Sequence, residues 1–160
     1  MIVVLMGVSG SGKTTVGEIL ARQTAWRYLD ADDHHPPENI AKMRAGTPLT
    51  DADRWPWLDR LNGLLREHQA AGEHVILACS ALRQVYRERL AQGLDDVRWI
   101  HLEGSFQLIA SRLAARKHRY MPASLLRSQF ETLEAPTDAL VVDITDPPEM
   151  LARRIAKRLK

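Results

Sequence analysis

The chain has 160 residues, of which 26% are charged and 45% hydrophobic, and its formal net charge is +2 at pH 7. This balance gives no electrostatic argument for binding nucleic acid or a membrane, and the length fits one domain with a single core. The one cysteine, Cys79, excludes a disulfide within the chain. Because the apolar run at the start is also too short for a signal peptide or a membrane span, we expect a cytoplasmic protein.

The first expected strand is the apolar run Ile2–Met6, and a helical pattern runs from Thr14 to Ala25. Between them stands G-V-S-G-S-G-K-T at residues 7–14. A strand, a glycine-rich turn and a helix in this order are typical of nucleoside triphosphate binding. The glycines let backbone N–H groups point at a phosphate, and the start of the helix adds its positive dipole end. The segment predicts ATP or GTP binding through Gly7, Val8, Ser9, Gly10, Ser11, Gly12, Lys13, Thr14 and Thr15.

Within this motif, Lys13 is expected to reach the β- and γ-phosphates, and the hydroxyl of Thr14 is expected to ligate Mg²⁺. Two carboxylates, Asp30 and Asp32, follow the second apolar run, Trp26–Leu29. Residues two apart on an extended segment share a face, so both are expected to point into one cleft. One of the pair would hold Mg²⁺ through water, and the other would accept the proton of an attacking hydroxyl.

Three further apolar runs alternate with helical patterns, namely His74–Cys79, Val97–Leu102 and Ala139–Ile144. This alternation predicts a three-layer α/β/α fold whose parallel sheet is covered on both faces. Two stretches, 34–57 and 116–136, exceed the minimum that such a fold needs. Insertions after strands on the nucleotide side of a sheet carry substrates and lids. We therefore expect one domain over residues 1–160, with a substrate-binding insertion at 34–57 and a helical lid at 116–136.

The sequence also restricts the class of nucleotide-binding protein. Neither N-K-x-D nor D-x-x-G, by which a GTPase reads guanine and the γ-phosphate, occurs in the chain. The length is too short for a large motor or transporter ATPase. These exclusions favour a small ATP-dependent phosphotransferase.

Four longer motifs carry a resemblance to a known family: D-A-D-D-H-H-P-P-E-N-I-A-K-M at 30–43, G-T-P-L-T-D-A-D-R-W-P-W-L at 46–58, C-S-A-L-R-Q-V-Y-R at 79–87 and S-Q-F-E-T-L-E-A-P at 128–136. With the phosphate loop, they make the chain similar to the gluconokinases, among the shikimate-kinase-like small kinases. The resemblance implies a five-stranded sheet in the order 2-3-1-4-5. It also implies a cytoplasmic homodimer that phosphorylates D-gluconate on its 6-hydroxyl with ATP and Mg²⁺.

The resemblance also implies roles for individual residues. Asp30 would assist Mg²⁺, and Asp32 would lie beside the substrate hydroxyl. His35 and Arg54 would contact the sugar acid, and a guanidinium suits a carboxylate because it offers a forked set of donors. Two cations after the third strand, Arg83 and Arg87, would also bind carboxylate or phosphate.

The expected lid departs from the family pattern. Many gluconokinases read R-x-G-H-F-M-P, whereas this chain has R-K-H-R-Y-M-P at 116–122. Arg116 and Arg119 are therefore both candidates to close on the γ-phosphate and neutralise charge during transfer. Arg112 is expected near the adenine or on the solvent face.

Two alternatives remain beside a gluconokinase. One or two changed cleft residues could shift specificity to a related sugar acid, and the altered lid is the one argument for an ATP-binding regulator without catalysis. A shikimate kinase is disfavoured because A-C-S-A at 78–81 replaces the glycine-rich turn expected there. A nucleoside kinase is disfavoured because the sequence offers no evident base-reading site.

Overall fold

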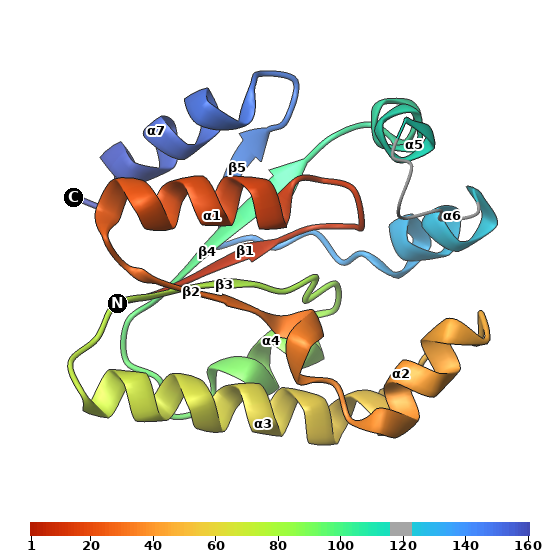
Figure 1. Cartoon of the computed structure of the whole chain (residues 1–160), viewed down its shortest axis with the longest axis horizontal. Helices are drawn as coiled ribbons and strands as arrows, with labels where there is room; N and C mark the ends of the chain where they lie inside the picture. Colours follow the sequence, from red (N-terminus) through yellow and green to blue (C-terminus); the bar gives the residue numbers. More distant parts are fainter. Residues whose placement is uncertain (116–122) are drawn as a thin grey trace.

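A five-stranded parallel sheet with helices on both faces forms the centre of the molecule (Figure 1). The computed structural model describes residues 1–115 and 123–160. The strand order is β2-β3-β1-β4-β5, as predicted, and the three-layer α/β/α fold is confirmed. In chain order the strands are β1 (Ile2–Met6), β2 (Arg27–Asp30), β3 (Val75–Ala78), β4 (Val97–Glu103) and β5 (Leu140–Asp143).

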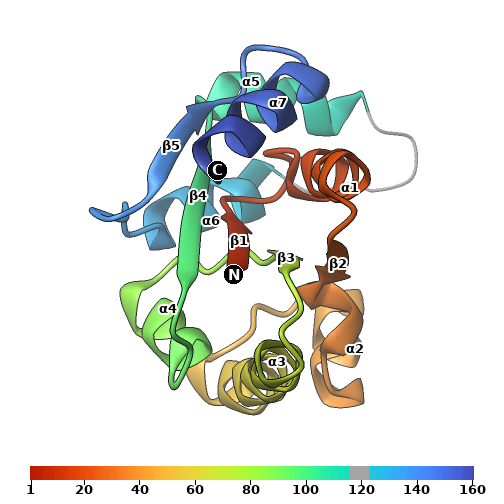
Figure 2. The ribbon, with the colours of Figure 1, turned by 90° about the vertical axis from the view of Figure 1, so that its left-hand side faces the viewer.

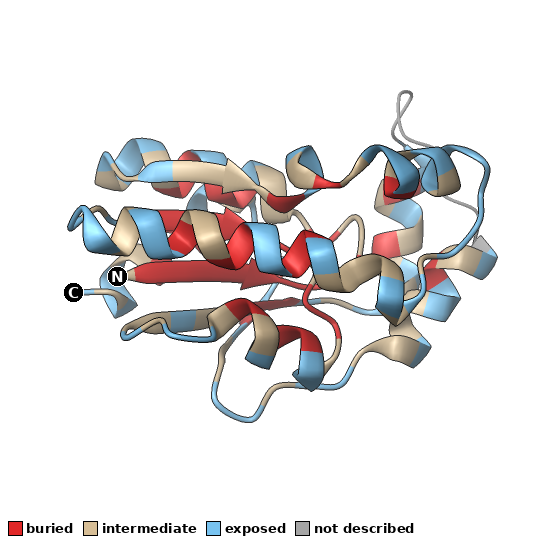
Figure 3. Ribbon diagram, turned by 90° about the horizontal axis from the view of Figure 1, so that it is seen from below, coloured by how far each residue is buried: buried red, intermediate tan, exposed pale blue. Residues whose placement is uncertain are grey.

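Strands β1 and β3 are apolar throughout because both of their faces are covered. Every residue of β1 and β3 is buried, which is typical of parallel strands between two helical layers. Along β1, Val3 and Leu5 join one core cluster, and Ile2, Val4 and Met6 join the other. Figure 3 shows the buried positions gathered on the central strands and on the helix sides that face them.

Two sets of helices cover the sheet (Figure 2). One face carries α1 (Lys13–Thr24) and α7 (Pro148–Arg158), and the other carries α3 (Asp51–Ala70) and α4 (Gln84–Ala91). Near the carboxyl ends of the strands lie α5 (Phe106–Ala114) and α6 (Ala123–Thr132). A helical segment was expected at 116–136, and α6 lies within that range. None of the helices in the described ranges is long and apolar enough to cross a membrane.

The stretch 34–57 is more helical than an irregular insertion would be. A 3₁₀ turn, η1 (Ala31–His34), leads into α2 (Pro37–Arg44), and α3 already begins at Asp51. A capping box fixes that early start, because the Thr50 hydroxyl accepts from the Asp53 N–H and the Asp53 carboxylate accepts from the Thr50 N–H. This reciprocal cap satisfies two N–H groups at the helix start and offsets the hydrogen bond that Pro56 removes from the helix.

Candidate active site

The phosphate loop runs from the end of β1 to the start of α1 and depends on its glycines. Gly7, Gly10 and Gly12 have φ angles of +149°, +82° and +98°, which side chains disfavour. A Cβ on Gly7 would lie 2.8 Å from the Leu102 carbonyl oxygen, and one on Gly10 would lie 2.7 Å from Leu113 Cγ. The loop therefore approaches β4 and α5 closely and leads into the N-terminus of α1, where helix N–H groups without intrahelical partners attract anions.

Lys13 crosses back over this loop. Its Nζ donates to the carbonyl oxygens of Gly7 at 2.9 Å and Val8 at 3.0 Å. The ammonium is thus held at the loop where the sequence predicts phosphate binding. Binding ATP there would exchange carbonyl contacts for contacts with phosphate oxygens, which carry more charge.

Thr14 and Asp30 meet at the edge of this loop, as the magnesium prediction requires. The Thr14 hydroxyl donates to Asp30 Oδ2 at 3.3 Å, and the Tyr28 hydroxyl reaches the same oxygen at 3.4 Å. A hydroxyl and a carboxylate are the oxygen ligands that Mg²⁺ prefers, usually with several waters and substrate phosphates. The oxygen atoms of these two side chains therefore fit Mg²⁺ as ligands.

The local geometry of the acidic pair differs from the sequence-based prediction. The prediction that Asp30 and Asp32 share a face of an extended segment is wrong, because the chain turns into η1 immediately after Asp30. Asp30 caps this turn by accepting from the Asp32 N–H at 3.0 Å. The Asp32 side chain is 70% exposed, with Oδ1 4.0 Å from His35 Nε2. Asp30 therefore points to Thr14, whereas Asp32 is left open to solvent.

His35 is buried behind Asp32 rather than exposed in a cleft. Its ring stacks on Trp57 with 4.2 Å between centroids, and Asn39 lies within hydrogen-bonding distance of its Nδ1 at 3.2 Å. Trp57 is itself fixed because its Nε1–H donates to the Ala31 carbonyl at 2.8 Å. Burial lowers the pKa of His35 below its usual value, so the imidazole is neutral at pH 7. It can offer Nε2 to a ligand beside Asp32.

Arg54 and Arg83, predicted to bind the sugar acid, come together around Tyr86. Their guanidinium carbons lie 5.1 and 5.6 Å from the centre of its ring. Arg54 donates to the Tyr86 hydroxyl at 3.1 Å, and Arg83 donates to Asp51 Oδ2 at 2.8 Å. The Tyr86 hydroxyl donates to Asp51, and this bond lowers the pKa of that carboxyl. Sequence reasoning missed Asp51 and Tyr86, although both lie inside the quoted motifs.

Arg87 lies elsewhere, in a buried structural role. Its guanidinium donates to the carbonyl oxygens of Ala81 at 2.7 Å and Glu134 at 2.8 Å, and to the Gln84 side chain at 3.2 Å. The residue is only 3% exposed. We therefore correct the predicted role in substrate binding, because these donors join the β3–α4 loop to the segment after α6.

Replacing Arg87 by methionine is expected to destabilise the fold by about 2 kcal/mol, because one buried and one partly buried carbonyl lose their donor. The melting temperature should fall by about 6 °C for a chain of this size, and the KM for the sugar acid should stay unchanged. Arg98→Met is the control, since Arg98 is exposed and pairs with Asp96. A raised substrate KM with normal stability would instead restore the substrate-binding role.

The remaining predicted cations are Arg112, Arg116 and Arg119. Arg112 Nη2 donates to the Ile144 carbonyl at 2.7 Å and so joins α5 to the loop after β5. Arg116 and Arg119 lie outside the described residues.

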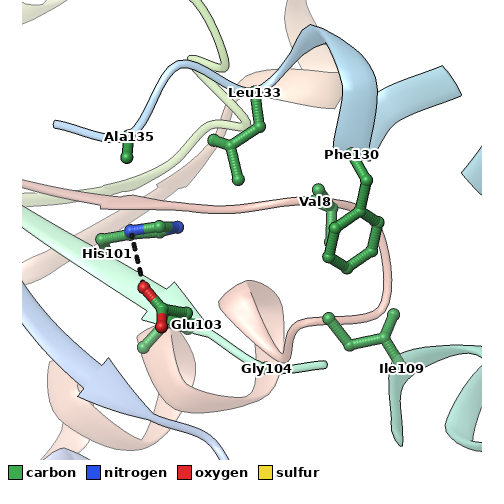
Figure 4. Close-up of a pocket in the computed structure, with 9 residues that line it drawn as sticks. Val8, His101, Glu103, Gly104, Ile109, Phe130, Leu133 and Ala135 are labelled. Atoms are coloured by element: carbon green, nitrogen blue, oxygen red, sulfur yellow. Dashed lines mark ion pairs between the residues drawn. The ribbon is translucent and has the colours of Figure 1, made fainter. Parts of the chain in front are cut away.

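A pocket of about 260 Å³ lies beside the loop, between the end of β4 and α6 (Figure 4). It is mostly apolar, and Phe130 of α6 and Leu133, just after that helix, face it together with Val8. Its polar members are His101 and Glu103, whose Nδ1 and Oε2 lie 3.8 Å apart. The sequence does not predict this pocket. Residues of a strand that line a pocket have the same pattern in the sequence as residues that pack against a helix.

The sequence is similar to those of known kinases, in agreement with a phosphate-binding site at this edge of the sheet. Residues 2–140 match the sequence model of the AAA domain family AAA_33. The chain is 46% identical over 152 residues to the thermoresistant gluconokinase of Escherichia coli K12, which covers 92% of this chain and 87% of that protein.

Solved structures give the same relationship. A sugar kinase of Janibacter sp. HTCC2649 superposes with a TM-score of 0.92 at 46% identity, covering 99% of this chain and 93% of the other. A gluconokinase of Sinorhizobium meliloti 1021 gives 0.84 at 40% identity, covering 98% and 94%. The shikimate kinase of Aquifex aeolicus shares the fold, with a TM-score of 0.62 at 18% identity over 99% and 96% of the two chains. The phosphate loop, the acidic turn and these similarities together place the chain in the gluconokinase family of P-loop kinases, to which it belongs.

Proposed function

We propose that this protein is an ATP-dependent gluconokinase, which transfers the γ-phosphoryl group of ATP to the 6-hydroxyl of D-gluconate and releases ADP and 6-phospho-D-gluconate. The observation that carries this proposal is the arrangement along one edge of the sheet. Because β2, β3 and β1 are parallel neighbours, the residues that follow them lie side by side. This edge therefore combines the acidic turn after β2, Arg83 after β3 and the phosphate loop after β1, at the place where α/β sheets bind ligands.

The residues divide the reaction between them. The loop and Lys13 bind the phosphates, and Asp32 orients the 6-hydroxyl and receives its proton. Arg54 and Arg83 bind the carboxylate of the sugar acid, assisted by His35. Asp51 pairs with Arg83, so an internal carboxylate makes the kind of contact that the substrate carboxylate would make.

Thr14 and Asp30 would hold Mg²⁺, which neutralises charge on the transferring phosphoryl group when it is bound. Arg116 or Arg119 would close on the γ-phosphate, and Arg112 would lie near the adenine. We further propose one kinase domain over residues 1–160, with the substrate-binding insertion at 34–57 and the lid at 116–136. The enzyme would act as a cytoplasmic homodimer.

The test is ADP formation by the purified protein with Mg-ATP and a panel of acceptors. Gluconate should stimulate strongly, whereas the neutral polyol of the same carbon chain should not, because it lacks the carboxylate that the arginines bind. Stimulation by a different sugar acid would keep the mechanism and replace the substrate. ATP binding without stimulation by any acceptor would favour the non-catalytic regulator.

A further inference from the structure

One side chain, Gln129, connects helix α6 to the phosphate loop. Its Oε1 accepts from the Ser9 N–H at 2.7 Å, and its Nε2 donates to Ser9 Oγ at 3.1 Å. The two residues are 120 positions apart in the sequence. An amide that uses both its acceptor and its donor on one residue holds that residue in one orientation, because each bond is directional.

The bond to Ser9 also fixes the position of Lys13. The Ser9 N–H and the Val8 carbonyl belong to one peptide group, which is planar, so they can turn only together. The Val8 carbonyl accepts from Lys13 Nζ at 3.0 Å and from the Ser11 N–H at 3.2 Å. Gln129 thus holds one end of the peptide group whose other end holds Lys13.

Helix α6 keeps its place through other contacts. Leu126 is buried, and Phe130 packs edge-on against Phe106 with 5.7 Å between ring centroids. The segment that follows is attached to the β3–α4 loop, because the Glu134 N–H donates to the Leu82 carbonyl at 2.7 Å. The two bonds of Gln129 can therefore be removed while the helix remains docked.

We propose that Gln129 is a positioning residue, which holds the Val8–Ser9 peptide group, and through it Lys13, in the orientation that receives the phosphates of ATP. Its amide contacts the loop and not the reacting atoms. The effect of this positioning role on turnover rests on the proposed function, whereas its effect on the affinity for ATP does not.

The first variant is Gln129→Met, which keeps the length of the side chain and removes both hydrogen bonds. We expect the Kd of ATP to rise about tenfold, as the loss of one or two hydrogen bonds predicts. We expect kcat to fall, while the KM of gluconate and the melting temperature stay unchanged. Glu131→Gln is the matched control, because Glu131 is an exposed residue of the same helix, and it should behave as the wild type.

A second variant separates the backbone bond from the hydroxyl bond. Ser9→Ala keeps the N–H that Gln129 binds and removes only Oγ, so its loss of ATP affinity should be clearly smaller than that of Gln129→Met. Isothermal titration with ATP, together with thermal unfolding, checks all three variants.

Three results would overturn the proposal. The first is an unchanged affinity for ATP in Gln129→Met. The second is a loss of ATP affinity in Ser9→Ala as large as that in Gln129→Met, which would assign the effect to the hydroxyl. The third is a loss of affinity that only follows a loss of folded protein. If the wild type binds ATP but gluconate does not stimulate ADP formation, the proposed function fails, and the titrations still decide the role of Gln129.

Discussion

Replacing Lys13 by methionine is expected to lower kcat about 10³-fold, the upper range for removing one preorganised donor from a developing negative charge. The ammonium is held at the phosphate loop by the carbonyls of Gly7 and Val8, and methionine fills similar space without charge. The folded state should be largely preserved, because those carbonyls lie on a loop and one of them also accepts from the Ser11 N–H.

Single-turnover measurement of ADP formation with saturating Mg-ATP and gluconate checks this expectation, because it reports the chemical step. Lys157→Met is the control, since Lys157 is an exposed residue of α7. A Lys13 variant that is impaired only in its KM for ATP would contradict a role in the transition state and leave a role in ground-state binding.

Replacing Asp32 by asparagine is expected to lower kcat about 10²-fold or more, the usual contribution of a positioned general base. Asparagine keeps the shape of the side chain but cannot accept the proton of the 6-hydroxyl. Stability and ATP affinity should change little, because the Asp32 side chain is 70% exposed and the turn is capped by Asp30.

Asp33→Asn provides the matched control, because Asp33 is the next residue of the same turn and is also exposed. Steady-state kinetics on both variants, with titration of ATP, measure the difference. Equal activity of the two variants, or a normal kcat in Asp32→Asn, would remove Asp32 from the reaction and require another residue to receive the proton.

The sheet could be predicted closely because its signals are local. Ile2–Met6 was predicted as a strand with the bounds that the structure has, and the ends of the other four strands lie within two residues of the predicted ones. Strands buried on both faces need continuous apolar runs, and such runs are visible without knowledge of their neighbours. The N-cap of α5 is a local signal too, because the Ser105 hydroxyl accepts from the N–H of Leu108, three residues further on.

The acidic turn was predicted in its members but not in its geometry. Residues two apart share a face only while the chain stays extended, and the Asp30 carboxylate itself ends the strand by capping η1. The early start of α3 was missed for a related reason. Residues 34–57 were predicted as an insertion, whereas the capping box of Thr50 and Asp53 begins the helix at Asp51.

The sequence by itself determined that this chain binds a nucleotide, which layers it forms and which family it belongs to, because each depends on residues close together in the chain. Only the tertiary structure separated Arg83, which reaches Asp51 beside Tyr86, from Arg87, which is buried against backbone carbonyls. It alone connected Gln129 with Ser9. The two arginines are four residues apart in the sequence, and their difference comes largely from distant partners, Asp51 for Arg83 and the Glu134 carbonyl for Arg87. A role set by desolvation and by distant hydrogen-bond partners is decided when the chain folds.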